Sequence, residues 1–289
     1  MRNKIINKLN IYLRMIKFEH SLFAFPFALA ALILAGWEKP VTFSMVFWII
    51  MAVVWARSAA MGFNRLVDAK WDAKNPRTAL REIPKGTISL QETGLFVMVS
   101  GALFILSAAM LSFLCFLLSF PVLFLLFFYS YTKRFTPLSH LVLGLVQSLG
   151  PLGVWVAVTG SLSWKIVPLA LAVGTYIAGF DLLYALQDVS FDRQEGLHSI
   201  PADFGITPAL ALSAILHGIT FISLLVLPYL FPLSNFYRFL VFIIGILLLI
   251  EHLIVKPQDL SKIEIAFFYV NSIVSVLLFT AMAIEEMIR

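Results

Sequence analysis

The sequence predicts an all-α, polytopic membrane protein with nine transmembrane helices. Of its 289 residues, 61% are hydrophobic and 13% are charged, whereas soluble domains carry about 25% charged residues. The mean hydropathy is +0.94, and successive apolar segments are long enough to cross a bilayer at about 1.5 Å per residue. Five of the seven aspartates fall in two short windows at the ends of apolar segments. Because carboxylates in a membrane are costly, these windows indicate function.

The chain begins with a basic amphipathic segment, residues 1–20, which is typical of a helix lying at the membrane surface. It does not fit a cleavable signal peptide, because further apolar spans follow. The first span is predicted over residues 21–37, with a kink at Pro26. The second covers residues 41–63 and brings Asn64 to its end.

The apolar stretch from Glu92 to Tyr131 is too long for one crossing, so we divide it near residues 110–112 into spans three and four. Its single cysteine, Cys115, is predicted to pack, since a lone cysteine forms no intrachain disulfide. Span five covers residues 141–159, where several glycines allow close helix approach. Span six covers residues 166–186.

Spans seven to nine are predicted over residues 207–230, 236–255 and 265–287. They are expected to carry no polar cluster comparable to the acidic windows. We interpret their isolated His217, Glu251 and His252 as packing or interface residues.

The first acidic motif, residues 64–72, places Asn64, Asp68 and Asp72 four residues apart. On a helix this spacing puts all three on one face, where the two aspartates repel each other by a few tenths of a kcal/mol. A divalent cation would offset that repulsion. A solvated helix end is the alternative, and the concentration of aspartates at membrane boundaries favours the cation site.

A basic loop, residues 73–89, follows the first motif. Basic groups beside carboxylates suggest a metal-bound polyanion such as diphosphate, although a positive-inside topology alone would also place them here. Arg57 precedes Asn64 by seven residues, two helical turns, and is expected on the same face. The alternative for Arg57 is snorkelling to the interface.

The second acidic motif, residues 181–192, spaces Asp181, Asp188 and Asp192 so that they lie within about 20° of one helix face. It resembles the first motif as a weak internal repeat, since Gly62-Phe63-Asn64 matches Gly179-Phe180-Asp181. If the two helix ends faced each other, their six polar groups would suit two or more hard cations. His198 in the following loop is expected to be inert rather than a proton shuttle.

Basic residues indicate the topology. With a cytoplasmic N-terminus, the inner segments hold sixteen lysines and arginines and the outer ones hold four, which is a positive-inside distribution. Both acidic motifs then lie on the cytoplasmic side. The basic residues that set the topology and those expected to bind an anionic substrate account for the pI of about 9.3. The sequence contains no nucleic-acid motif.

Along essentially its whole length the chain resembles the UbiA-type intramembrane aromatic prenyltransferases. The Asn-x-x-x-Asp-x-x-x-Asp of the first motif, the second motif with its downstream Gly196-x-x-Ser199-Ile-Pro201, and Tyr129-Ser130 with Lys133-Arg134 carry the resemblance. It implies a single domain over residues 1–289, nine helices around a central cavity capped by cytoplasmic loops, and a place in the cytoplasmic membrane. It also implies Mg²⁺-dependent transfer of a polyprenyl chain from its diphosphate to an aromatic acceptor.

The resemblance and the residue chemistry together suggest roles for individual side chains. The expected metal ligands are Asn64, Asp68, Asp72, Asp188 and Asp192. The expected catalytic residues are Asp181, Arg57, Arg81, Lys133 and Arg134. Substrate binding is expected from Asn64, Arg77, Tyr184, Arg193 and Ser199.

The opening segment, residues 15–28, resembles the 4-hydroxybenzoate polyprenyltransferase-like branch of the family. It leaves 4-hydroxybenzoate and a hydroxynaphthoate open as acceptors in quinone synthesis, with haem, chlorophyllide and glycerophosphate lipids ranked lower. Two other classes fit the sequence less well. A CDP-alcohol phosphotransferase has a motif that is not matched before Asp68. A cation-coupled transporter binds its ions near the midplane, whereas the acidic residues here lie at a membrane boundary beside a basic loop. The sequence sets neither prenyl length nor oligomeric state.

Overall fold

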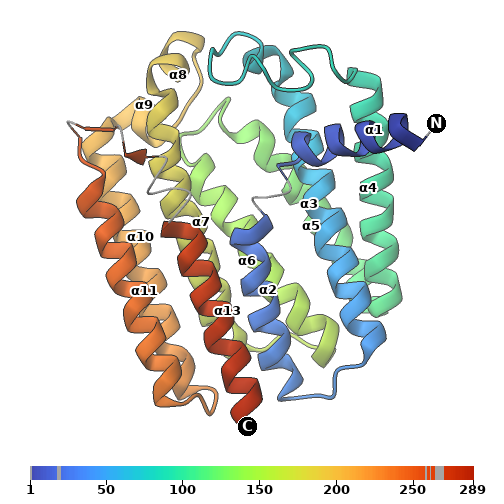
Figure 1. Cartoon of the computed structure of the whole chain (residues 1–289), viewed down its shortest axis with the longest axis vertical. Helices are drawn as coiled ribbons and strands as arrows, with labels where there is room; N and C mark the ends of the chain where they lie inside the picture. Colours follow the sequence, from blue (N-terminus) through green and yellow to red (C-terminus); the bar gives the residue numbers. More distant parts are fainter. Residues whose placement is uncertain (1, 18–20, 258, 261, 264–269) are drawn as a thin grey trace. The chain divides into compact units, whose positions relative to one another are not determined.

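The computed structural model describes residues 2–17, 21–257, 259–260, 262–263 and 270–289. Within these ranges, eight helices are long and apolar enough to cross a membrane (Figure 1). The first predicted span forms α2 (Ser21–Gly36), which is apolar but shorter than these eight. The prediction of an all-α, polytopic fold is therefore confirmed, with nine spans only if α2 is counted.

The chain divides into two compact units, which are described separately. The first comprises residues 1–21 and 42–131, and contains α1 (Arg2–Met15), α3 (Phe43–Asp72), α4 (Leu90–Leu111) and nearly all of α5 (Phe113–Thr132). The second comprises residues 22–41 and 132–289. Its helices are α2, α6 (Ser139–Thr159), α7 (Val167–Ala185), α8 (Val189–Glu195), α9 (Ile200–Phe204), α10 (Ile206–Val226), α11 (Asn235–Ile254) and α13 (Asn271–Ile288). The single-domain prediction stays a prediction.

The helix boundaries follow the sequence closely. The predicted break near residues 110–112 falls at Ser112, whose extended backbone separates α4 from α5. The predicted surface helix forms α1, which ends at Met15; residues 1 and 18–20 of that prediction lie outside the described part of the chain. The ninth predicted span corresponds to α13, and its residues 265–269 likewise lie outside.

In the first unit, α3 and α4 pack against each other along their lengths. A glycine brings them close, because a Cβ added at Gly62 would lie 2.9 Å from the Val97 side chain. The end of α1 joins this unit through a small core of Met15, Ile16 and Ile88. This packing places the last turns of α3 beside the loop that leads to α4.

The second unit is built around α7. Of the residues in the apolar window of Trp164–Glu195, 72% are buried, more than in any other described span. Helices α6 and α10 pack on α7 (Figure 1). As the sequence predicted, a glycine of α6 permits close approach: a Cβ at Gly144 would lie 2.3 Å from the carbonyl oxygen of Gly174.

Gly144→Ala is expected to destabilise the protein by about 1–3 kcal/mol, because the added methyl group would force α6 away from the rigid backbone of α7. Gly150→Ala in the same helix is the matched control. It meets no atom within 4 Å, and its greater helix propensity makes a small gain the expected result. Thermal unfolding in detergent measures both variants; equal midpoints would contradict the close contact.

Candidate functional site

The first acidic motif lies on the last turns of α3, which continues through it to Asp72. The Asn64 amide Nδ2 donates a hydrogen bond of 3.1 Å to Asp68 Oδ2 one turn on, as expected for residues on one helix face. Asp68 is 2% exposed and Asp72 is 7% exposed. The motif is therefore not a solvated helix end but a pair of buried carboxylates.

Cationic side chains balance these carboxylates. Arg81 Nη1, from the loop after α3, lies 2.7 Å from Asp72 Oδ1. The loop is tied back to the helix by Thr78 Oγ1, which donates to the Asp72 carbonyl oxygen at 3.1 Å. Arg65 is 6% exposed, and its charge interacts with those of Asp68 and Asp72. The other carboxylate oxygen of Asp72, Oδ2, is buried and makes no hydrogen bond, so it is available to a cation.

Two other predicted residues of the first unit differ in exposure. Arg57 is partly buried on α3, and its Nη2 donates to the Lys17 carbonyl oxygen at 3.2 Å. Arg77 is exposed in the loop, where its backbone N–H donates to Asn75 Oδ1 at 3.0 Å. The Arg57 guanidinium is thus directed toward the segment after α1, whereas Arg77 lies on the exposed surface of the loop.

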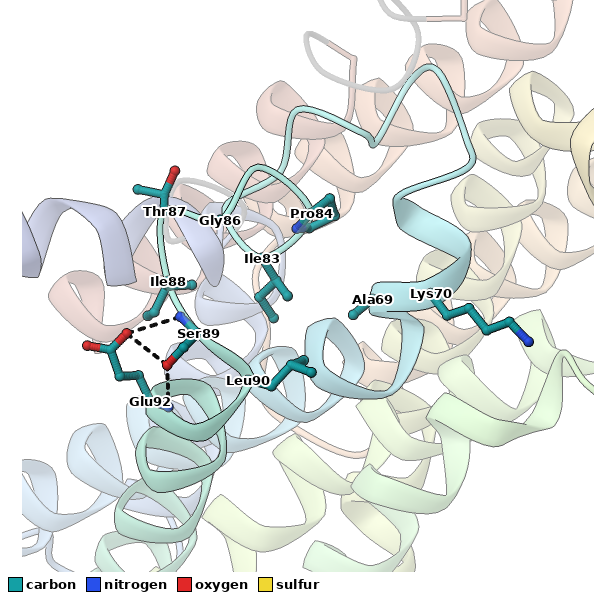
Figure 2. A pocket seen from close by; sticks show the side chains of 10 residues that line it. All are labelled: Ala69, Lys70, Ile83, Pro84, Gly86, Thr87, Ile88, Ser89, Leu90 and Glu92. Carbon is teal, nitrogen blue, oxygen red and sulfur yellow. Dashed lines mark hydrogen bonds between the residues drawn. The ribbon is translucent and has the colours of Figure 1, made fainter.

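A pocket of about 600 Å³ opens beside the same loop (Figure 2). Its wall combines the end of α3, at Ala69 and Lys70, with the loop from Ile83 and the start of α4. Ser89 caps α4: Ser89 Oγ accepts from the Glu92 N–H at 3.1 Å, and Glu92 Oε2 accepts from the Ser89 N–H at 3.0 Å. Lys8 Nζ contacts the other Glu92 oxygen at 2.7 Å, and this carboxylate raises the pKa of the Lys8 ammonium. Ala69 and Lys70 of the first acidic motif thus line the pocket, whereas Asn64, Asp68 and Asp72 are not among its lining residues.

The second acidic motif does not lie on one uninterrupted helix, which corrects the sequence-based geometry. Helix α7 ends at Ala185, a 3₁₀ turn covers Leu186–Asp188, and α8 carries Asp192. A 3₁₀ turn advances about 20° more per residue than an α-helix, so it changes the direction of the later side chains relative to Asp181. Asp181, Asp188 and Asp192 are each partly exposed.

Each end of this motif has a specific partner. Asp181 Oδ2 lies 2.7 Å from His140 Nδ1 on α6. Asp192 Oδ2 accepts a 3.0 Å hydrogen bond from Ser199 Oγ, which also caps α9. The charges of Asp188 and Lys133 interact with the Asp192 carboxyl. Four side chains predicted from the sequence are thus brought together around α8: Lys133, Asp188, Asp192 and Ser199.

The remaining predicted residues surround this group. Arg193 is exposed, and its Nε donates to the Ala202 carbonyl oxygen at 2.8 Å. The Lys133 carbonyl oxygen accepts from the His198 N–H at 2.7 Å, which links the segment before α6 to the loop after α8. The side chains of Arg134 and Tyr184 are partly buried.

The sequence interpretation missed three features. It assigns no role to Arg65, whose charge interacts with those of Asp68 and Asp72, or to His140, which contacts Asp181. The expectation that the last three spans carry no polar cluster is wrong, because His217, Glu251 and His252 bring their ligand atoms within 4.8 Å of one another. The contacts of His140 and His217 join residues 34 or more positions apart, which helical periodicity does not relate.

The model of the UbiA prenyltransferase family matches residues 24–273, which include both motifs. The chain belongs to the UbiA prenyltransferase family. A solved UbiA homolog from Aeropyrum pernix K1, determined in its apo form, is 30% identical over 92% of this chain and 98% of that chain, with a TM-score of 0.83. A UbiA homolog from Archaeoglobus fulgidus, solved bound to GPP and Mg²⁺, is 20% identical over 94% of this chain and 99% of that chain, with a TM-score of 0.70, and shows the same fold.

Curated relatives of this UbiA protein agree with the family. A 4-hydroxybenzoate octaprenyltransferase from Vibrio campbellii is 28% identical over 79% of this chain and 80% of that protein. A polyprenyl transferase from Arthrobotrys oligospora is 34% identical over 54% of this chain, and the match spans 43% of that longer protein. The protein is thus a multi-pass membrane prenyltransferase, which confirms the predicted class of enzyme.

Proposed function

We propose that this UbiA protein transfers a polyprenyl chain from its diphosphate to a carboxylated aromatic acceptor in a Mg²⁺-dependent reaction. The observation that carries the proposal is the pair of buried carboxylates, Asp68 and Asp72, with Arg81 in contact. The relatives support it, since the Vibrio campbellii protein is named for 4-hydroxybenzoate and an octaprenyl chain. The Archaeoglobus fulgidus homolog, which has the same fold, binds GPP and Mg²⁺.

The donor atoms fit Mg²⁺, which prefers oxygen ligands and few protein carboxylates. Asp72 Oδ2 is buried without a hydrogen bond, and Asn64 presents a neutral amide one turn before Asp68. The proposed ligands are the oxygen donors of both motifs: Asn64, Asp68, Asp72, Asp188 and Asp192. Bound Mg²⁺ would neutralise charge on the diphosphate and so make it a better leaving group.

The cationic residues are proposed to receive the leaving diphosphate. Arg81, Lys133 and Arg134 would stabilise its charge as the C–O bond breaks and the bonding electrons leave with oxygen. Further substrate contacts are proposed for Asn64, Arg77, Tyr184, Arg193 and Ser199. The allylic cation left behind requires a water-poor surrounding, which a chain with 27 phenylalanines supplies, and aromatic faces stabilise it.

The acceptor is proposed to be 4-hydroxybenzoate or a hydroxynaphthoate of quinone synthesis. Its electron-rich ring attacks the allylic carbon and then loses a proton. Asp181 is proposed to engage the acceptor hydroxyl or to take this ring proton, with His140 holding its carboxylate. Arg57 is proposed to hold the acceptor carboxylate or the diphosphate.

The proposed orientation places the N-terminus and both motifs on the cytoplasmic side of the cytoplasmic membrane. The sixteen-to-four distribution of basic residues supports it. Since diphosphates and carboxylates do not cross bilayers unaided, this orientation also gives both substrates access from the compartment that produces them.

An assay with purified protein tests the reaction, and one with sealed membrane vesicles tests the orientation. Purified protein is incubated with Mg²⁺, geranyl diphosphate and either 4-hydroxybenzoate or 1,4-dihydroxy-6-naphthoate, and products are identified by mass spectrometry. We expect a prenylated product from one acceptor, abolished by chelating Mg²⁺ and restored by adding it back. Inverted membrane vesicles should form product from external substrates, and right-side-out vesicles should not. Intact diphosphate with every acceptor and with longer prenyl donors would overturn the proposed function.

A further inference from the structure

A second group of polar side chains lies in the helices of the second unit, away from the acidic motifs in the sequence. It comprises His217 on α10 with Glu251 and His252 on α11, two helices that pack together (Figure 1). His217 is 2% exposed and Glu251 is 0% exposed, whereas His252 is partly exposed. An ionisable carboxylate buried among membrane spans is costly unless it is compensated.

Three ligand atoms converge in this group. His217 Nδ1 lies 3.0 Å from His252 Nε2 and 3.3 Å from Glu251 Oε2. Zinc bound to nitrogen and oxygen at about 2.0–2.2 Å in a tetrahedron separates its ligand atoms by about 3.3–3.5 Å. Two of the three separations are close to these edges, and all three ligand atoms lie within 4.8 Å of one another, so small side-chain movements would bring them around an ion.

The surrounding contacts orient the ligand atoms inward. His217 Nε2 lies 3.3 Å from the carbonyl oxygen of Tyr176, to which it donates, so its Nδ1 presents a lone pair to Glu251 and His252. Glu251 Oε1 accepts a 3.0 Å hydrogen bond from Asn271 Nδ2, and Oε2 is buried without a hydrogen bond. Outer-shell partners of this kind are the rule for metal-ligating histidines and carboxylates.

A glycine makes room for the central histidine. A Cβ added at Gly179 on α7 would lie 2.4 Å from His217 Cδ2 and 2.5 Å from its Nε2. The ring therefore packs directly on the α7 backbone, where it reaches the Tyr176 carbonyl oxygen. Glycine is thus required at the position that fixes the tautomer of His217.

We propose that His217, Glu251 and His252 are the ligands of a divalent transition-metal ion, and that this ion is Zn²⁺. Two imidazole nitrogens and one carboxylate favour Zn²⁺ over Mg²⁺, which takes oxygen ligands. Three protein ligands would leave a fourth position of a tetrahedral site for water or another ligand. The ion would link α10 to α11, compensate the buried carboxylate and stabilise the second unit.

The test is metal analysis of the protein purified in detergent without chelator. We expect about one equivalent of zinc per chain in the wild type, and less than about a tenth in His252→Ala. His198→Ala is the matched control: this loop histidine pairs with Asp203 and should leave the zinc content unchanged. Asp72→Asn should also retain zinc, which separates this site from the proposed Mg²⁺ site.

A second measurement covers the case in which His252→Ala fails to fold. Stripping zinc from the wild type should lower its thermal midpoint, and Zn²⁺, but not Mg²⁺, should restore it. Replacing zinc by Co²⁺ should give the visible absorption of a tetrahedral site. The proposal would be overturned if the thermal midpoint of metal-free wild-type protein did not change on adding Zn²⁺. It would also be overturned if well-folded His252→Ala contained as much zinc as the wild type. Either result would leave the three side chains as a hydrogen-bonded core network.

Discussion

Asp72→Asn is expected to lower the catalytic efficiency of prenyl transfer by about 10²- to 10³-fold, the loss found when one group that stabilises developing charge is removed. Asp72 is 7% exposed, with Oδ1 in contact with Arg81 and Oδ2 buried without a hydrogen bond. Asparagine has nearly the same shape, so the helix end should persist. It lacks the negative charge that would hold Mg²⁺ and that now pairs with Arg81.

The measurement is kcat/KM for the prenyl diphosphate at several Mg²⁺ concentrations, since this ratio reports the loss of transition-state stabilisation. The variant should need more Mg²⁺ than the wild type for half of its maximal rate. Asp203→Asn is the control, because it neutralises an aspartate outside the proposed site. Wild-type efficiency and an unchanged Mg²⁺ requirement in Asp72→Asn would remove this carboxylate from the set of ligands.

Local patterns were enough to predict most helix boundaries. The division predicted near residues 110–112 falls at Ser112, and the apolar stretch predicted from Glu92 forms α4 from Leu90, where the structure shows a capping box of Ser89 and Glu92. The i, i+4 spacing of Asn64 and Asp68 likewise predicted a contact that the structure shows. In each case the residues that determine the feature lie within a turn of one another, so periodicity and capping rules reach them.

Features that depend on distant parts of the chain were not predicted. His140 meets Asp181 across 41 residues because α6 and α7 pack closely at Gly144, and no local pattern marks that register. The 3₁₀ turn over Leu186–Asp188 was not predicted for a different reason: its residues are compatible with an α-helix, so periodicity does not mark the change in winding.

The repeated glycines connect the two motifs to packing. The weak internal repeat aligns Gly62 with Gly179, and at both positions a Cβ would collide with a side chain of a neighbouring helix. At Gly62 that neighbour is Val97, whereas at Gly179 it is His217. In each copy of the repeat, a glycine at a close helix contact therefore comes two residues before the motif begins, and the acidic groups follow it.

Asp181→Asn is expected to lower kcat for prenyl transfer about 10²-fold, the usual contribution of a positioned general base, with little change in the KM for prenyl diphosphate. The Asp181 carboxylate lies 2.7 Å from Nδ1 of His140, which is 5% exposed. This contact fixes the direction of the carboxylate. Asparagine can keep a hydrogen bond to the imidazole, but it cannot accept a proton from the acceptor.

An acceptor deuterated at the prenylated ring carbon separates the two roles proposed for Asp181. If Asp181 takes the ring proton, the substitution makes deprotonation slow, and the kinetic isotope effect on kcat should rise above that of the wild type. If Asp181 engages the hydroxyl instead, the acceptor KM should rise with no added isotope effect. Asp203→Asn is a matched control, because Asp203 forms another aspartate–histidine pair in the second unit, 2.9 Å from His198 Nδ1. Unchanged kcat and acceptor KM in Asp181→Asn would exclude both roles and leave the Asp181–His140 pair as a contact that joins α6 to α7.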